Sequence, residues 1–415
     1  MRRRFNLCEL IADKELSDRA HFRGALKFEN CIIYDLSMSG LFDNVRNDFE
    51  GPQGHNEETY SFYNRSSRKE IQDARLQMEA WFNRYPEVEQ ADLRRTFKND
   101  FDAGFFELFL FTLFSRMGYA VRVHPDVPNG GKTPDFLISG MGTEFYLEAK
   151  VSYYENERER ATARRLATVY DVLDRSTILD FFIWLRKVEM KSTRQPQANK
   201  IRRDVELSTE RYQADVLYAH MQQSQNWTPS WEVYQDDDVY IEFGLVPKSP
   251  SSRGTPAQRA IGVYGQEPKV LQNAASLKKA LRMKASRYDI LDKPYIIAVN
   301  DIDMMALDID DVMDCLFGTT CVVPELMEQT GAVQEFRQHD GFFTGREDHG
   351  QHTRVSAAFI TQVNPSNWRS ALYWMFEHEK AQHPISLRTS PLVTRFIENA
   401  TIYRTSGTSF GEIIG

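Results

Sequence analysis

The sequence predicts an α/β fold with a mixed sheet, whose elements follow the order α-β-β-β-α-β. Residues 105–114 (FFELFLFTLF) are apolar except at Glu107 and Thr112, and a helix that is apolar nearly all round is normally buried. Three segments have the β-branched and aromatic content of strands: 119–124, 133–139 and 143–151. A charged amphipathic stretch then precedes the apolar run 179–185 (LDFFIWL), which indicates a helix that crosses over to a fourth strand.

The second and third strands are expected to form a hairpin that turns at Gly140-Met141-Gly142. The numbers of directly opposite residues then sum to about 283, so that Asp135 lies across from Glu148. Opposite residues on neighbouring strands have Cβ atoms roughly 4.5–5.5 Å apart, close enough for two carboxylates to hold one divalent ion. Lys150 points to the same face as Glu148 because strand side chains alternate.

The third strand has one apolar and one polar face. The face predicted to join the core holds Phe145, Leu147, Ala149 and Val151. The face predicted to be polar holds Glu144, Tyr146, Glu148 and Lys150. Burial of an unpaired carboxylate costs several kcal/mol. Glu107, in its apolar helix, is therefore expected to reach the same cluster of charged groups.

A helix with an acid, a strand, and a hairpin carrying Pro134-Asp135 and Glu148-Ala149-Lys150 resemble the PD-(D/E)XK nuclease superfamily and its restriction-endonuclease-like fold. The resemblance covers about residues 95–190. It implies that Asp135 is the first acidic ligand, Glu148 the second, Lys150 the lysine of the motif, and Glu107 the helix glutamate that many members carry.

The same resemblance implies a metal-dependent endonuclease that hydrolyses phosphodiester bonds, with DNA as the favoured substrate. Asp135, Glu148 and the backbone carbonyl of Ala149 would ligate the metal, Glu107 would orient a metal-bound water or hold a second ion, and Lys150 would position the attacking water. Such oxygen ligands suit Mg²⁺ or Mn²⁺. A role in prokaryotic defence or repair, a homodimer and a partner protein of a defence system are further implications of the resemblance.

Other interpretations of these residues remain open. Glu148 and Lys150 could form a solvated surface pair, and Asp135 could be an ordinary residue at the start of a strand. The fold could also serve as a catalytically inactive nucleic-acid-binding or assembly module, or as a ribonuclease.

Basic residues beyond the hairpin are candidates for contacts with nucleic acid. They are Arg186, Lys187, Lys191 and Arg194 after the predicted fourth strand, and Lys278, Lys279 and Arg282 on the polar face of a later helix. Charged residues in such runs commonly face water, and solvation is the alternative for both groups. The chain carries a net charge of -8, so any attraction for a polyanion must be local.

Three regions are predicted along the 415 residues. Residues 1–90 have no role that can be inferred, and the polar stretch 44–67 is expected to be a mobile loop. Residues 91–190 form the nuclease-like core, and 191–415 form an α/β extension. A helix at 270–288 and a strand at 294–300 in this extension are candidates to continue the core sheet.

The location of the protein is expected to be the cytoplasm. The four cysteines make neither a disulfide framework nor a zinc signature, as their spacing is irregular: Cys8, Cys31, Cys315 and Cys321. The first residues lack the apolar stretch of a signal peptide, and no run of 18 apolar residues occurs, so neither secretion nor a membrane span is expected.

Overall fold

The structure is a computed structural model. It describes residues 40–43, 47–127, 131–153, 157–224, 226–255, 259–264, 273–288, 291–302, 307–322, 335–344, 350–398 and 401–415. Cys8 and Cys31 lie outside these residues.

The largest element of the fold is a mixed sheet of eight strands in the order β1-β2-β3-β8-β11-β12-β13-β14. The strands are β1 (Ala120–Val123), β2 (Phe136–Gly140), β3 (Thr143–Ser152), β8 (Tyr295–Asp301), β11 (Ala357–Thr361), β12 (Tyr373–Glu377), β13 (Thr394–Glu398) and β14 (Thr401–Arg404). β1, β2 and β3 are antiparallel neighbours, whereas β3, β8 and β11 run parallel. The predicted α/β class with a mixed sheet is confirmed.

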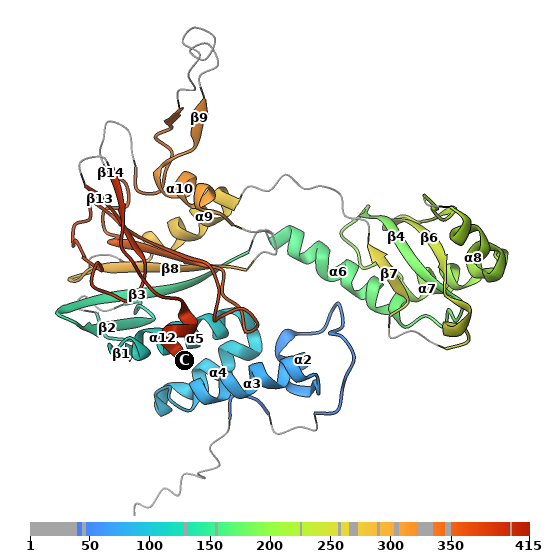
Figure 1. Cartoon of the computed structure of the whole chain (residues 1–415), viewed down its shortest axis with the longest axis horizontal. Coiled ribbons are helices and arrows are strands. Elements are labelled where there is room, and N and C mark those ends of the chain that lie inside the picture. Colours follow the sequence, from blue (N-terminus) through green and yellow to red (C-terminus); the bar gives the residue numbers. More distant parts are fainter. Residues whose placement is uncertain are drawn as a thin grey trace, which may run out of the picture. The chain divides into compact units, whose positions relative to one another are not determined.

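Helices cover both faces of this sheet (Figure 1). On one face, α5 (Phe101–Arg116) and α12 (Phe410–Ile414) pack against alternate strand residues that include Phe136, Leu147 and Phe359. On the other face, α9 (Asn273–Ala285) and α10 (Ile309–Phe317) pack against Leu137, Tyr146 and Ile297. The side chain of Asp100 accepts a hydrogen bond from the backbone N–H of Ala103 at 3.1 Å and so caps α5.

The prediction that residues 179–185 form the fourth strand of the core is wrong. The segment 179–185 falls in β4 (Phe181–Met190), which belongs to a separate four-stranded sheet and does not pair with β3. The parallel neighbour of β3 is β8, with Glu148 beside Ile297 and Lys150 beside Val299. The order α-β-β-β-α-β is therefore made by α5-β1-β2-β3-α9-β8, and it ends near residue 301 rather than 190.

The four-stranded sheet has the order β5-β6-β4-β7 and a hydrophobic core of its own. Its other strands are β5 (Trp231–Gln235), β6 (Val239–Pro247) and β7 (Ile261–Tyr264). The helices of this part of the chain are α6 (Glu157–Asp174), α7 (Ala198–Ser208), α8 (Ala214–Gln223), and the short 3₁₀ turns η1 (Thr209–Arg211) and η2 (Pro250–Ser252). Side chains of β4 alternate, because Ile183 and Leu185 are buried while Trp184 is half-buried and Arg186 exposed. Such alternation is typical of a sheet covered on one face.

The hairpin of β2 and β3 has the predicted register. Phe136 pairs with Leu147 and Ser139 with Glu144, so that the numbers of paired residues sum to 283. The turn has two central residues, Met141 and Gly142, with φ of 51° and 77°. Positive φ at both positions is what a two-residue turn of type I′ requires, and it matches the twist of the flanking strands.

The N-terminal described residues do not form a separate region that ends at residue 90. Helices α2 (Thr59–Arg65), α3 (Lys69–Phe82) and α4 (Glu87–Asn99) contribute Tyr60, Trp81 and Phe97 to the same core as α5. The prediction of a mobile loop over 44–67 is wrong for α2, whose Tyr60 and Phe62 are buried. The fold also has a small sheet of β9 (Thr320–Val322) and β10 (Glu335–Arg337).

Candidate active site

The structure brings Asp135 and Glu148 to the same place in the hairpin. Asp135 directly precedes β2, and the register of the hairpin continues to Glu148 on β3. The backbone N–H of Ala149 donates a hydrogen bond to Oδ2 of Asp135 at 2.6 Å. The backbone N–H of His124 donates to the carbonyl oxygen of Asp135 at 3.0 Å, which holds the residue from the side of β1.

The polar face predicted for β3 is closed to solvent at its middle, although Glu144 is exposed and Lys150 is half-buried. Tyr146 is buried, and Glu148 is 0% exposed. Helix α9 covers this face, and its Leu277 and Leu281 pack in the same cluster as Tyr146. The physical reason is that β3 runs parallel to β8 in a sheet whose two faces are both covered by helices, α5 on one face and α9 on the other.

Glu148 binds three side chains that the sequence did not single out for this site. Its Oε1 accepts hydrogen bonds from Nζ of Lys284 and, at 2.9 Å, from a guanidinium nitrogen of Arg287. Its Oε2 accepts a hydrogen bond from the hydroxyl of Tyr288. The side chain of Lys284 is 13% exposed and that of Arg287 is 35% exposed. A carboxylate that is withdrawn from water is thus stabilised by two cations and a hydroxyl.

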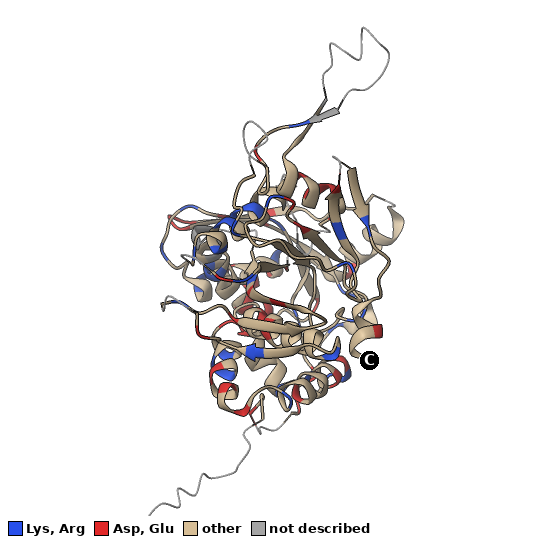
Figure 2. Ribbon diagram, turned by 90° about the vertical axis from the view of Figure 1, so that its left-hand side faces the viewer, with Lys and Arg blue, Asp and Glu red and all other residues tan. Residues whose placement is uncertain are grey.

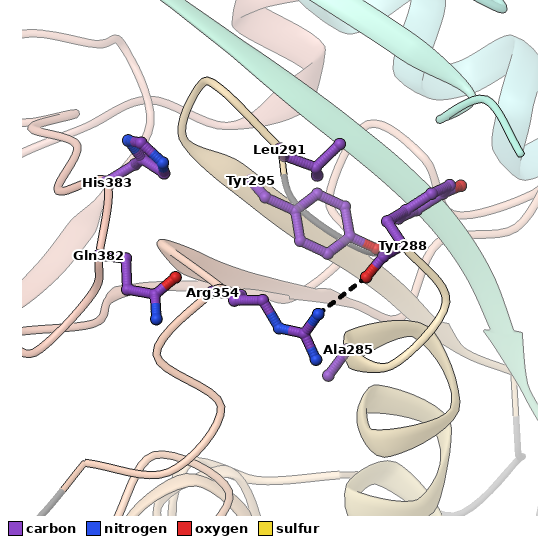
Figure 3. A pocket seen from close by; sticks show the side chains of 7 residues that line it. All are labelled: Ala285, Tyr288, Leu291, Tyr295, Arg354, Gln382 and His383. Carbon is purple, nitrogen blue, oxygen red and sulfur yellow. Dashed lines mark hydrogen bonds between the residues drawn. The ribbon is translucent and has the colours of Figure 1, made fainter. Parts of the chain in front are cut away.

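Tyr288 is fixed from both sides. A guanidinium nitrogen of Arg354 donates a hydrogen bond to the backbone carbonyl of Tyr288 at 3.0 Å, as Figure 3 shows. Tyr288 and Tyr295 meet edge to face, with ring centroids 5.6 Å apart. The cavity beside them has a volume of about 20 Å³, room for about one water molecule. It is therefore too small for a substrate.

Asp135 is in an environment that disfavours its charge. Burial, and after it the charge of Glu148, raises the pKa of Asp135 from its ordinary value of 3.8 to about 7, against the opposing effects of Lys284 and the hydrogen bond from Ala149. A buried carboxyl whose ionisation is disfavoured by a neighbouring carboxylate is an arrangement that a bound cation would relieve.

Glu107 lies in a neighbouring cluster rather than beside the other two acids. The hydroxyl of Tyr85 donates a hydrogen bond to Oε1 of Glu107 at 2.7 Å. Burial raises the pKa of Glu107, although Tyr85 and the charge of His124 oppose the rise. The charge of Glu107 is also one of the causes that raise the pKa of Asp135. Glu107 thus influences Asp135 through its charge, while its described hydrogen-bond partner is Tyr85, and its membership of the site stays a prediction.

His124 interacts with acids of both clusters, with Glu89 and Glu107 on one side and with Asp135 on the other. Nδ1 of His124 lies 3.0 Å from Oε2 of Glu89, on α4. Burial alone would lower the pKa of His124, but the hydrogen bond to Glu89 and the charges of Glu107, Glu89 and Asp135 outweigh it, and the pKa is raised. A positive φ of 43° places His124 in the left-handed region, where non-glycine residues are uncommon.

The donors of the site suit a hard divalent cation in their chemistry. Carboxylate and carbonyl oxygens are the ligands of Mg²⁺ and Mn²⁺, and Mg²⁺ commonly keeps several waters with only one or two carboxylates. Asp135, Glu148 and the carbonyl of Ala149 fit this description. In the described part of the chain, however, no three His, Cys, Asp or Glu residues are arranged to hold a metal. Any ion would thus depend on water or substrate oxygens to complete its shell.

Lys150 is half-buried on β3, and its place two residues after Glu148 puts it on the same face. Beside it on the sheet, Val299 of β8 is fully buried. The predicted group of Asp135, Glu148 and Lys150 therefore shares one face of the hairpin.

The first predicted basic group lies in the four-stranded sheet, where acidic residues offset its charge. Arg186 pairs with Glu242 at 3.2 Å, Lys187 with Glu189 at 3.0 Å, and Arg194 with Asp238 at 2.8 Å. Lys191 donates to the carbonyl oxygen of Asp236 at 2.7 Å. Two of these cations also lie over aromatic rings: Arg186 is 4.9 Å from the ring centre of Trp231, and Lys187 is 5.9 Å from that of Tyr240.

The second predicted basic group lies on α9, as expected. Lys279 and Arg282 are exposed, whereas Lys278 pairs with Asp340 at 3.1 Å. The predicted apolar face of the helix is confirmed, because Leu277, Leu281, Ala285 and Tyr288 are all buried. Figure 2 shows basic and acidic positions interspersed along the ribbon rather than separated by sign.

The sequence carried one signal for the missed residues. Lys284 and Tyr288 are four positions apart, with Arg287 between them, at the end of the predicted helix 270–288. Once that helix is assigned as the crossover before β8, its polar side chains next to the apolar face must lie over β3. The sequence prediction instead took the charged stretch before residues 179–185 as the crossover helix, and it therefore did not place Lys284, Arg287 and Tyr288 over β3.

Comparison with known protein families, with curated proteins and with solved structures found no match for this chain. Among the described residues, no helix has the length and apolar character needed to cross a membrane.

Proposed function

We propose that this chain is a metal-dependent nuclease of the PD-(D/E)XK superfamily, which hydrolyses phosphodiester bonds and has DNA as its favoured substrate. The observation that carries the proposal is the hairpin register, which joins Asp135 to the N–H of Ala149 and sets it beside Glu148, with Lys150 on the same face. A role in defence or repair rests on the sequence resemblance alone.

The path of the chain supports the proposal. The elements α5-β1-β2-β3-α9-β8 follow the α-β-β-β-α-β order that the resemblance implies, with Asp135 directly before β2 and Glu148 on β3. The raised pKa of Asp135 supports it as well, because perturbed acids gather at functional sites.

In this proposal Asp135, Glu148 and the carbonyl of Ala149 hold the ion. A bound Mg²⁺ or Mn²⁺ would supply Lewis acidity toward the phosphate and a water of lowered pKa. Lys150 orients the attacking water and balances negative charge as it develops on the phosphate. Glu107 accepts a hydrogen bond from Tyr85, and burial raises its pKa; in this role it would hydrogen-bond a water at the edge of the site.

A cleavage assay tests the proposal. The full chain is incubated with single- and double-stranded DNA and RNA, with Mg²⁺ or Mn²⁺ and with chelator. Ion-dependent cutting is expected, and Asp135→Asn should abolish it. The sequence has another Pro-Asp pair, Pro125-Asp126, outside the hairpin. The matched control is Asp126→Asn, which changes the exposed acid of that pair. Equal loss of cutting in both variants would contradict the assignment of the site.

A second candidate function is an inactive nucleic-acid-binding module of the same fold. The observation that favours it is the occupation of both oxygens of Glu148 by side chains of the protein. In this case the chain binds nucleic acid with an affinity that falls steeply as salt rises, and divalent ions lead to no cleavage.

A further inference from the structure

Two cationic side chains bind Glu148, although one would balance the single negative charge of its carboxylate. Nζ of Lys284 and a guanidinium nitrogen of Arg287 both meet Oε1, and the hydroxyl of Tyr288 meets Oε2. An oxygen of a carboxylate accepts about two hydrogen bonds, so Oε1 has no capacity for a further donor or ligand. A metal ion can use this oxygen only if Lys284 or Arg287 leaves it.

The two cations have more access to solvent than Glu148 does. Arg287 follows α9, and its side chain is 35% exposed, while the long side chain of Lys284 is 13% exposed. The Arg287 side chain therefore reaches solvent and the Lys284 side chain is mostly but not fully covered, whereas the Glu148 side chain itself is 0% exposed. Tyr288 differs from them, because its backbone is tied to Arg354 and its ring is packed in the core.

Electrostatic forces favour the replacement of Lys284 and Arg287 by a divalent ion at Glu148. A divalent ion held by Asp135 and Glu148 neutralises the carboxylates that attract Lys284 and Arg287, and it repels both side chains. Two released cations beside a metal site suit the phosphate of a substrate, since a guanidinium pairs with phosphate through two parallel hydrogen bonds.

Building on the proposed nuclease function, we propose that Lys284 and Arg287 are phosphate-binding residues that Glu148 holds while no ion is present. When a divalent ion binds, they leave Glu148 and bind a phosphate of the nucleic acid next to the ion. They thereby couple binding of the ion to binding of the substrate.

The first part of the proposal is that a divalent ion competes with Lys284 and Arg287 for Glu148. Binding of Mn²⁺ alone, measured by titration calorimetry on the full chain without nucleic acid, tests this part. Lys284→Gln removes a competitor for Glu148, so Mn²⁺ should bind about tenfold more tightly, the equivalent of one hydrogen bond to a charged group. Arg287→Gln should shift the affinity in the same direction, which provides a second variant if the first does not fold. The control is Lys279→Gln, which changes an exposed lysine of the same helix and should leave the affinity unchanged.

The second part of the proposal is that the released side chains bind a phosphate of the nucleic acid. Binding of a DNA oligonucleotide with and without Ca²⁺ tests this part, with gel analysis to verify that the DNA stays intact. The wild-type chain should gain affinity for DNA when Ca²⁺ is added, and Lys284→Gln or Arg287→Gln should lose most of that gain. Without an ion, both variants should bind DNA as the wild type does, because Glu148 then holds the two side chains.

The outcomes separate this inference from the function on which it rests. Absence of Mn²⁺ binding in the wild type and in every variant would overturn both. Mn²⁺ binding by the wild type that Lys284→Gln and Arg287→Gln leave unchanged or weaken would overturn the exchange alone. Equal loss of DNA affinity in these variants with and without Ca²⁺ would also overturn it, because the side chains would then be available to DNA at all times.

Discussion

The replacement of Asp135 by asparagine should stabilise the metal-free protein. The amide side chain would keep an oxygen for the N–H of Ala149, as a protonated Asp135 does, but it carries no charge to oppose that of Glu148. A rise in pKa from 3.8 to about 7 corresponds to at most about 4 kcal/mol of lost stability once the group is ionised. Partial exposure of the side chain and relaxation around it reduce this, so that we expect a gain between about 1 and 4 kcal/mol.

The gain should depend on pH in a defined window. Between pH 3.8 and about 7, the folded wild type binds more protons at Asp135 than the unfolded chain does, so its stability falls as the pH rises. Asp135→Asn lacks this group. The difference between variant and wild type should therefore grow across the window and become constant above about pH 8.

Urea unfolding and melting curves from about pH 5 to about pH 9 measure this difference. At about pH 8 the melting temperature of the variant should exceed that of the wild type by a few degrees. Addition of Mn²⁺ should narrow the gap, because the ion stabilises the form that binds it. Asp126→Asn should show no such pH-dependent gain. A less stable Asp135→Asn at about pH 8, or a constant difference over the whole range, would refute the reasoning.

Three other substitutions address separate parts of the chain. Lys150→Met should lower the rate of ion-dependent cleavage by about 100-fold or more with little change in melting temperature, and unchanged cleavage would remove the role assigned to Lys150. Met141→Asn should raise the free energy of unfolding by about 0.5 kcal/mol in urea titrations, because Asn adopts positive φ more readily than Met, and a loss of stability would argue against the type I′ turn. Trp231→Ala should weaken binding of single-stranded nucleic acid about tenfold if bases stack beside Arg186, while Val233→Ala, on the exposed part of the same strand, should bind as the wild type does.

Local patterns in the sequence were sufficient to predict the hairpin and its register. The alternation in residues 143–151 and the flanking glycines predicted a register in which Asp135 meets Glu148, and the structure has that register. A hairpin can be predicted in this way because its turn and its two strands are adjacent in the chain, so that the turn length sets the pairing. The apolar character of α5 likewise predicted its burial without knowledge of its neighbours.

The fourth strand of the core could not be chosen by the same means. Both α6-β4 and α9-β8 are a helix followed by a strand, and a parallel partner for β3 is separated from it by a long stretch of chain. A weak signal was present, because residues 295–300 (YIIAVN) are nearly all apolar, as in a central parallel strand, whereas the second half of β4 (RKVEM) is polar.

The sequence by itself determined which residues form the hairpin and which acids it brings together, because these depend on contacts between near neighbours in the chain. Only the tertiary structure decided what covers that hairpin. The pairing of β3 with β8 lays α9 over Glu148, and it thereby places Lys284, Arg287 and Tyr288, more than a hundred residues away, on a single carboxylate. Such contacts arise from burial of apolar faces that are distant in sequence, and no local pattern specifies which two faces meet.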